Sequence, residues 1–163
     1  MAIKNIITEE NKLLFEKSEK ITLFDSSLRE LLEDMKDTLK DSGGIGIAAP
    51  QIGVLKRVVV IDFGNGTECF ELINPEITQK SGEQETLEGC LSCPGQFGMT
   101  KRPMKVTVKA QDILGNEHVY EGEGILASAF CHEIDHLDGI LFKSHVTRML
   151  TEEELESLYN RET

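Results

Sequence analysis

Two histidines stand four residues apart toward the end of this chain, with a glutamate directly after the first. The stretch reads Cys131-His132-Glu133-Ile134-Asp135-His136. On an α-helix, positions four apart lie one turn above each other on the same face, so His132 and His136 can bind one metal ion while Glu133 lies beside it. The spacing predicts a metal-binding helix of the kind found in hydrolases.

Two histidines on a helix can also be ordinary polar residues at the edge of a core. Here Phe130, Ile134 and Leu137 surround the motif and indicate that the helix is buried. Burying several ionisable side chains costs free energy unless each one has a partner. A cation bound by the histidines removes that cost, and the sequence therefore favours a metal site.

A catalytic metal site usually takes three protein ligands and leaves one position open for water. Beyond His136 the chain continues Leu137-Asp138-Gly139-Ile140-Leu141-Phe142, which does not resemble the ligand-bearing tail of the zinc proteases. We therefore expect the third ligand upstream, in the segment 88–95 (Glu-Gly-Cys-Leu-Ser-Cys-Pro-Gly), where small residues and a proline let the backbone approach an ion. Cys90 is the favoured ligand.

Length and charge restrict the class of protein. The chain has 163 residues without repeats or low-complexity tracts, which predicts a single metallohydrolase domain over residues 1–163. Its 17 basic and 29 acidic residues give a net charge of −12, which argues against extensive contact with nucleic acid. No signal-peptide pattern and no run near the roughly 20 apolar residues of a membrane span occurs. We expect a cytoplasmic protein with reduced cysteines and no membrane contact.

Hydrophobic periodicity predicts the order of the elements. A helix is expected to begin near Ser27, which has capping-box spacing with Glu30, and to end at residues 42–44. Apolar runs predict antiparallel strands at 57–63, 69–77 and 105–112, with a turn at Asn65-Gly66 after the first. Segment 125–139 is predicted to be the helix that carries the histidines.

The last predicted element is a helix over 151–159, where Thr151 and Glu154 again have capping-box spacing, and we expect this helix to cover one edge of a sheet. The predicted fold class is α+β: antiparallel β-sheets packed around a central metal-binding helix, with an N-terminal and a C-terminal helix.

Three separated motifs, taken together, resemble the peptide deformylase family. They are residues 44–51 (Gly-Ile-Gly-Ile-Ala-Ala-Pro-Gln), 88–92 (Glu-Gly-Cys-Leu-Ser) and 132–136 (His-Glu-Ile-Asp-His), in the order of the family. The flanking segments are similar as well, so the resemblance covers nearly the whole chain. It implies metal-dependent hydrolysis of the N-formyl group from the formylmethionine of newly made polypeptides, with release of formate.

The chemistry expected of such a site uses a metal-bound water as the nucleophile. An ion held by the three ligands would lower the pKa of that water toward about 7. Glu133 is placed to take the water's proton and pass it to the leaving amine, acting as general base and then as general acid. The resemblance implies that the Gln51 carboxamide and the Leu91 backbone N–H donate to the developing oxyanion.

The resemblance also implies an apolar pocket for the methionine side chain. By position in the family pattern, the lining residues would be Ile45, Gly46, Ile125, Ser128 and Ala129. Outside the ligands, the carboxylates of Glu88 and Asp135 are expected to orient the histidines or to pair with a cation such as Arg102. A surface or capping role is the alternative for both carboxylates.

The sequence predicts which residues bind the metal but does not determine which metal they bind. A site of one cysteine and two histidines accepts Fe²⁺, Zn²⁺, Ni²⁺ or Co²⁺, and intrinsic affinity disfavours iron. The resemblance favours Fe²⁺ in the cell and N-formylmethionyl peptides of nascent chains as partners. The acidic run 152–154 argues against docking onto ribosomal RNA through this end of the chain.

Three positions depart from the family pattern. Cys131 stands where the family usually has Gln, Cys93 replaces a common aliphatic residue, and Phe97 lies where many members place Arg. Phe97 puts a salt bridge to the bound peptide in doubt, and Cys131 either makes the site more oxidisable or fills space.

A non-catalytic metal site is the main alternative from another class. Cys90 and Cys93 form a C-x-x-C pair that could complete a closed Cys₂His₂ cage with His132 and His136. The 38 residues between Cys93 and His132 exceed a zinc finger's spacing, and Glu133 would then have no role.

Other readings of the motifs fit less well. A redox C-x-x-C pair normally opens a helix, whereas Pro94-Gly95 follows this one. Residues 44–49 match the dinucleotide fingerprint Gly-x-Gly-x-x-Ala but follow a helix instead of a strand. A generic zinc peptidase is the remaining enzyme alternative.

Overall fold

The computed structural model describes residues 2–64, 66 and 68–161. Its helices are α1 (Ser26–Ser42), α2 (Ile125–Leu137) and α3 (Glu152–Arg161), with short 3-10 turns η1 (Lys12–Phe15), η2 (Ala49–Ile52) and η3 (Phe142–His145). Its strands are β1 (Gly46–Ala48), β2 (Val58–Ile61), β3 (Phe70–Ser81), β4 (Gln84–Cys90), β5 (Cys93–Arg102), β6 (Lys105–Gln111), β7 (Glu117–Glu123) and β8 (Val146–Met149).

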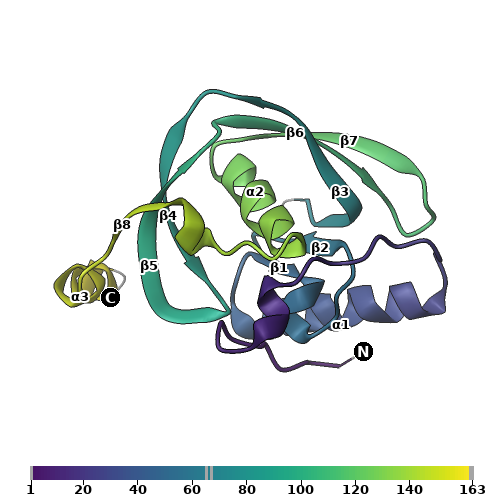
Figure 1. Ribbon diagram of the computed structural model, residues 1–163, viewed down its shortest axis with the longest axis horizontal. Helices are drawn as coiled ribbons and strands as arrows, with labels where there is room; N and C mark the ends of the chain where they lie inside the picture. Colours follow the sequence, from purple (N-terminus) through teal and green to yellow (C-terminus); the bar gives the residue numbers. More distant parts are fainter. Residues whose placement is uncertain (1, 65, 67, 162–163) are drawn as a thin grey trace.

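The strands form two antiparallel sheets. The larger has the order β1-β2-β3-β6-β7 and the smaller has the order β4-β5-β8. Figure 1 shows α2 in the middle of the molecule, with the strands of the larger sheet curving around it and β4 and β5 at one side. The predicted α+β class with antiparallel sheets is therefore confirmed.

Strand β2 is buried along its whole length because a helix covers each side of its sheet. Val59 and Ile61 pack in the hydrophobic cluster that contains α2, whereas Val58 and Val60 pack in the cluster that contains α1. Successive side chains of a strand point to opposite faces. Burial on both faces explains why this segment is a continuous apolar run instead of an alternating one.

Helix α1 starts earlier than its sequence predicts. Asp25 has an extended backbone and its carboxylate accepts a hydrogen bond from the Leu28 backbone N–H at 3.3 Å, so Asp25 is the N-cap. The predicted Ser27–Glu30 capping box is wrong because Ser27 already lies inside the helix. Gly43, with φ of +72°, ends the helix in the left-handed conformation.

Helix α2 is anchored by Phe130, which is fully buried. Its ring meets Phe70 of β3 edge to face, with ring centroids 5.3 Å apart. A Cβ atom at Gly122 of β7 would lie 2.7 Å from the Phe130 ring, so the glycine makes room for it. This packing fixes the rotation of α2 and thereby the direction of its histidines.

Five strands of the structure have no counterpart in the sequence prediction. They are β1, β4, β5, β7 and β8. Strands β4 and β7 (Gln-Glu-Thr-Leu-Glu-Gly-Cys and Glu-His-Val-Tyr-Glu-Gly-Glu) are mostly polar, so apolar patterning does not reveal them. Part of the predicted turn at Asn65-Gly66 lies outside the described residues.

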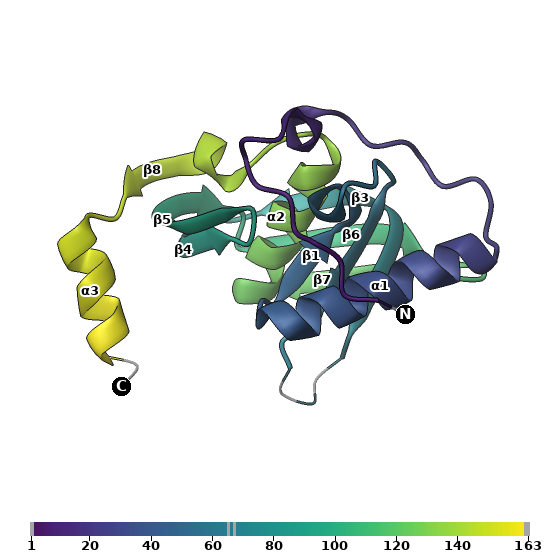
Figure 2. The same ribbon diagram turned by 90° about the horizontal axis from the view of Figure 1, so that it is seen from below.

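The C-terminal helix α3 projects away from the body of the protein (Figures 1 and 2). The expectation that it covers a sheet edge is wrong, because β8 pairs with β5 and takes that place. The Thr151–Glu154 capping box is confirmed by reciprocal hydrogen bonds of 3.2 Å between each side chain and the other residue's backbone N–H. Among the described residues, no helix combines the length and apolar character needed to cross a membrane.

Replacing Phe130 with alanine is expected to lower the free energy of unfolding by about 3–5 kcal/mol, because it removes a fully buried ring and leaves a cavity. Urea denaturation measures the change. The control is Ile125→Ala on the same helix, whose side chain is 69% exposed; it should change stability by no more than about 0.5 kcal/mol. Equal losses in the two variants would contradict this account of the core.

Candidate active site

Three side chains with metal-binding atoms converge where α2 faces the end of β4. The sulfur of Cys90 and a ring nitrogen each from His132 and His136 all lie within 4.8 Å of one another. Cys90 Sγ is 3.3 Å from His136 Nε2. Cys90 is the last residue of β4, and a register shift between Gly89 and Cys90 separates it from the regular ladder. Residues 42 positions apart in the sequence are thus brought together by the two sheets.

Each imidazole presents one ring nitrogen to the cluster, and for His136 this is Nε2, which faces Cys90 Sγ. His132 Nδ1 donates to Glu88 Oε1 at 2.8 Å, which directs Nε2 toward the cluster. His136 is fully buried, and its Nδ1 has no hydrogen-bond partner among the described residues. One thiolate and two imidazoles, one of them oriented by a carboxylate, form the donor set of a catalytic transition-metal site. The residues present therefore fit a divalent metal ion.

Glu88 is held by Arg102 of β5 in a buried ion pair. Arg102 Nε lies 2.8 Å from Glu88 Oε2, Arg102 Nη2 lies 2.9 Å from Oε1, and the two side chains are only 3% and 7% exposed. Burial alone would raise the pKa of Glu88, but hydrogen bonds from Arg102 and His132 outweigh it and hold that pKa well below its usual range. Arg102 also contacts Asp135 Oδ2 at 2.9 Å, and Thr100 and Thr86 donate to Glu88.

The pKa values of the two histidines shift in opposite directions because their neighbours differ. Burial opposes protonation of His132, but the carboxylates of Glu133 and Glu88 outweigh burial and raise its pKa. For His136, burial and the neighbouring His132 lower the pKa well below its usual value, so this ring stays neutral. A metal cation would supply the positive charge that the two carboxylates favour.

Glu133 lies next to the cluster and is almost fully buried, with 5% of its surface exposed. Burial raises its pKa to about 7, although His132 acts in the opposite direction. Its Oε1 has no hydrogen-bond partner among the described residues. A carboxylate with a pKa near neutrality and a free oxygen can both accept and release a proton.

Gln51 is fixed by both ends of its carboxamide. Its Oε1 accepts a hydrogen bond from the Ala48 backbone N–H at 2.9 Å, which sets the orientation of the amide. Its Nε2 then points to Ser92 Oγ at 3.2 Å and to Cys90 Sγ at 3.6 Å. Turn η2, which carries Gln51 directly after β1, places the side chain beside the cluster.

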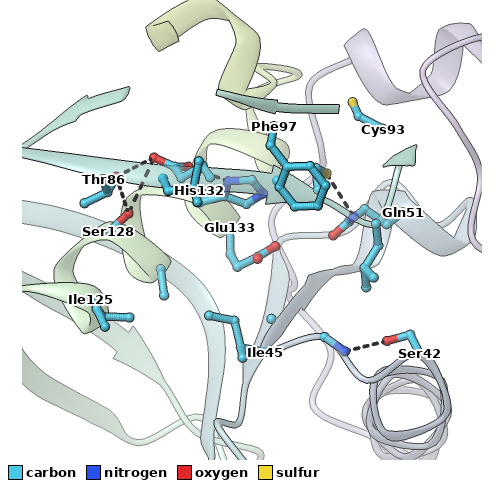
Figure 3. Close-up of a pocket in the computed structure, with 18 of the residues that line it drawn as sticks. Ser42, Ile45, Gln51, Thr86, Cys93, Phe97, Ile125, Ser128, His132 and Glu133 are labelled. Carbon is cyan, nitrogen blue, oxygen red and sulfur yellow. Dashed lines mark hydrogen bonds and ion pairs between the residues drawn. The ribbon is translucent and has the colours of Figure 1, made fainter. Parts of the chain in front are cut away.

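A cavity of about 890 Å³ opens beside these residues. Figure 3 shows Glu133 in the middle of it, with His132 and Gln51 to either side. The cavity is lined by all five residues that the sequence assigns to the methionine pocket (Ile45, Gly46, Ile125, Ser128 and Ala129) and by the two assigned to the oxyanion (Gln51 and Leu91). The fold thus brings these seven residues to one place, while their roles stay predictions.

Sequence reasoning missed several lining residues on β4 and β5. Thr86, Leu87 and Gly89 belong to the polar strand that apolar patterning does not detect. Phe97, noted only as a departure from a family pattern, covers Gly89: a Cβ there would lie 2.5 Å from the Phe97 ring. Phe97 is 38% exposed, so it forms part of the cavity's apolar rim.

The other two departures from the family pattern lie outside the ligand cluster. Cys93 is buried, and its Sγ donates to Glu9 Oε2 at 3.5 Å. Cys131 is buried in the core between α2 and the larger sheet, where its apolar surroundings raise its pKa to about 11. Of the four cysteines, only Cys90 belongs to the group of potential metal ligands among the described residues.

Comparison with known proteins assigns this architecture to a family. The model of the polypeptide deformylase family matches residues 3–152. This chain belongs to the peptide deformylase family. It is a metal-dependent hydrolase that removes the formyl group from nascent polypeptides.

Individual members of the family are similar to this chain over nearly the whole length of both proteins. The peptide deformylase of Caldicellulosiruptor bescii is 55% identical over 161 residues, covering 99% of this chain and 96% of that protein. Peptide deformylase 1 of Bacillus subtilis is 45% identical over 155 residues, covering 95% and 97%. The crystal structure of a peptide deformylase from Legionella pneumophila matches with a TM-score of 0.86 at 40% identity, covering 99% of this chain and 98% of that one.

Gly46 leaves no room for a side chain beside Glu133, since a Cβ atom there would lie 2.5 Å from Glu133 Oε2. The variant Gly46→Ala is therefore expected to displace the carboxylate and to lower kcat on the order of 10²-fold, with the metal retained. Formate release and metal analysis test this. In the control Gly44→Ala, the new methyl group meets only the end of the Leu91 side chain, at 3.1 Å, and the loss should be smaller. Equal activity of Gly46→Ala and the parent would contradict the assigned position of Glu133.

Proposed function

We propose that Cys90, His132 and His136 hold one divalent metal ion, and that Glu133 moves the protons of the deformylation reaction. The observation that carries this proposal is the convergence of three ligand atoms within 4.8 Å at the wall of a cavity that also contains a buried, unpaired carboxylate. When bound, the ion would lower the pKa of a water molecule toward about 7 and would polarise the formyl carbonyl.

Glu133 is proposed to act as general base and then as general acid. Its carboxylate takes a proton from the attacking water and delivers it to the amine nitrogen that leaves the formyl carbon. A pKa of about 7 suits both steps, because the group is then close to balance between its two forms at neutral pH. Its burial excludes competing proton donors from bulk water.

Gln51 and Leu91 are proposed to stabilise the negative charge that develops on the formyl oxygen. A carboxamide nitrogen carries two N–H donors. Those of Gln51 are directed to Ser92 Oγ at 3.2 Å and to Cys90 Sγ at 3.6 Å, and the longer of these two bonds is proposed to give way to the substrate oxygen. The Leu91 backbone N–H, one residue beyond Cys90, is the proposed second donor.

The methionine side chain is proposed to enter the apolar part of the cavity formed by Ile45, Ile125 and Ala129. Ser128 does not make this part polar, because its hydroxyl is within 3.3 Å of Thr86 Oγ1 and 3.5 Å of Glu88 Oε2. Gly46 lies against Glu133 and lines the same cavity, so a methionine bound there would have its formyl group close to the carboxylate.

Around the ligands, Glu88, Arg102 and Asp135 are proposed to orient His132 and to fix the position of α2. We further propose Fe²⁺ as the ion in the cell, with Zn²⁺, Ni²⁺ or Co²⁺ able to occupy the same ligands. The single domain over residues 1–163 and the cytoplasmic location stay predictions. Metal analysis of protein prepared without oxygen tests the choice of ion.

The closed Cys₂His₂ cage is not favoured by the position of Cys93. Its thiol contacts Glu9 and does not join the three ligand atoms. A closed cage would also leave Glu133 without a role.

Formate release from an N-formylmethionyl peptide should be lost in Glu133→Ala, by about 10²- to 10⁴-fold, while the metal stays bound. Cys93→Ser should keep both metal and activity, because Cys93 is not a ligand. A closed cage predicts the reverse, with metal lost only in Cys93→Ser. Comparison with N-acetylated and unblocked peptides separates a deformylase from a generic peptidase, which would cleave all three.

Gln51→Ala should lower kcat by about 10²- to 10³-fold with little change in KM, because the lost donor acts on charge that exists only in the transition state. Steady-state kinetics of formate release measure both constants. A matched change is Ser92→Ala, which removes the neighbour of the Gln51 amide but no donor to the substrate and should cost less. A rise in KM alone would contradict the oxyanion role of Gln51.

A further inference from the structure

Cys93 lies directly opposite the proposed metal ligand Cys90 at the turn between β4 and β5. The two residues are paired across the antiparallel ladder. The two residues are also the first and fourth of the tight turn 90–93, and the ends of such a turn have Cα atoms less than about 7 Å apart, close to the range that a disulfide requires. Both residues also line the same cavity, so their side chains meet in one space.

The cavity gives small molecules access to this pair. Both residues line it; Cys90 is half-buried, whereas Cys93 is 1% exposed. A space of about 890 Å³ that admits a peptide end also admits a hydroperoxide. Cys131, although adjacent to His132 in sequence, packs in the core and does not line the cavity.

We propose that Cys90 and Cys93 form an oxidation site in which a hydroperoxide converts the ligand thiolate reversibly to a disulfide. In the first step the Cys90 thiolate attacks the peroxide O–O bond, takes one oxygen to become a sulfenic acid, and releases the other with a proton as alcohol or water. In the second step the Cys93 sulfur attacks the sulfenic sulfur, the S–S bond forms, and the hydroxyl leaves as water with the thiol's proton. The two cysteines supply the two electrons that reduce the hydroperoxide.

Glu9 contacts the thiol of Cys93 and is placed to accept its proton in the second step. Its Oε2 accepts from the Cys93 thiol at 3.5 Å and from Lys143 Nζ at 2.6 Å, and its Oε1 accepts from Gln96 at 2.9 Å. Its backbone N–H donates to the Ser92 carbonyl at 3.0 Å. The carboxylate can therefore take the thiol proton as Cys93 attacks, while the N-terminal segment keeps the turn in place.

The consequence is loss of metal binding without permanent damage. A disulfide sulfur lacks the thiolate charge that metal binding uses, so two histidines alone remain as ligands. The same bond protects Cys90 from further oxidation to sulfinic and sulfonic acids, which thiols do not reverse. Reduction of the disulfide then restores all three ligands. This inference rests on the proposed role of Cys90 as a ligand.

The test treats the zinc-loaded protein with a small excess of hydrogen peroxide, since Zn²⁺ itself is not oxidised. Cys93→Ser and Cys131→Ala are treated in parallel, with Cys93→Val as a second variant should the serine lower stability. Three readouts follow: zinc release to a chromogenic chelator, the mass of the tryptic peptide 81–101, and formate release before and after dithiothreitol with zinc resupplied.

The parent and Cys131→Ala should release zinc, yield peptide 81–101 lighter by about 2 Da, and recover activity on reduction. Cys93→Ser and Cys93→Val should release zinc with peptide 81–101 heavier by about 32 or 48 Da, without recovery. The inference is overturned if the Cys93 variants recover as the parent does, if the parent's Cys90 is itself overoxidised, or if the disulfide joins other cysteines. The mass and zinc readouts hold even if formate release fails, which keeps this test separate from the proposed function.

Discussion

The buried carboxylate of Glu88 connects the parts of the molecule that make the site. It lies on β4, is paired with Arg102 of β5, and accepts a hydrogen bond from His132 of α2. Arg102 reaches on to Asp135 of the same helix, so the smaller sheet is tied to α2 at two points one turn apart. Removing one partner of a buried ion pair typically costs about 3–5 kcal/mol because the other charge is left uncompensated. The orientation of one imidazole and the docking of the smaller sheet on the central helix therefore depend on the same group.

Two of the surrounding side chains point into the cavity, and neighbouring backbone groups limit the positions that these side chains can take. Glu133 and Gln51 face the cavity, and each is constrained by backbone nearby: Gly46 leaves just enough space for the carboxylate, and the Ala48 N–H sets the direction of the amide. Both constraints come from strand β1 and the turn that follows it. A short strand that covers little surface thus fixes the geometry of two proposed catalytic groups.

The sequence predicts best what depends on local spacing. The two histidines one helical turn apart, the amphipathic α1 and the apolar β2 can all be found from periodicity. Strands β4 and β5 cannot, because most of their residues are polar or small, with few large apolar side chains among them. The contact of Gln51 with Cys90, and the role of Glu9 behind Cys93, join residues 39 and 84 positions apart, and no pattern within one segment encodes them. For α3, the capping box depends on local spacing and can be predicted from the sequence, whereas the position of the helix in the fold cannot.

The three proposed ligands come from two parts of the fold. The histidines lie on a helix that packs against the larger sheet, and the cysteine is the last residue of a strand in the smaller sheet. Only the native docking of the two sheets brings them together. An ion bound by all three therefore acts as a tether between halves of the fold, and its binding free energy adds to the free energy of unfolding through thermodynamic linkage. With the proposed ligands, the resistance of this protein to heat would depend on metal supply as well as on its hydrophobic core.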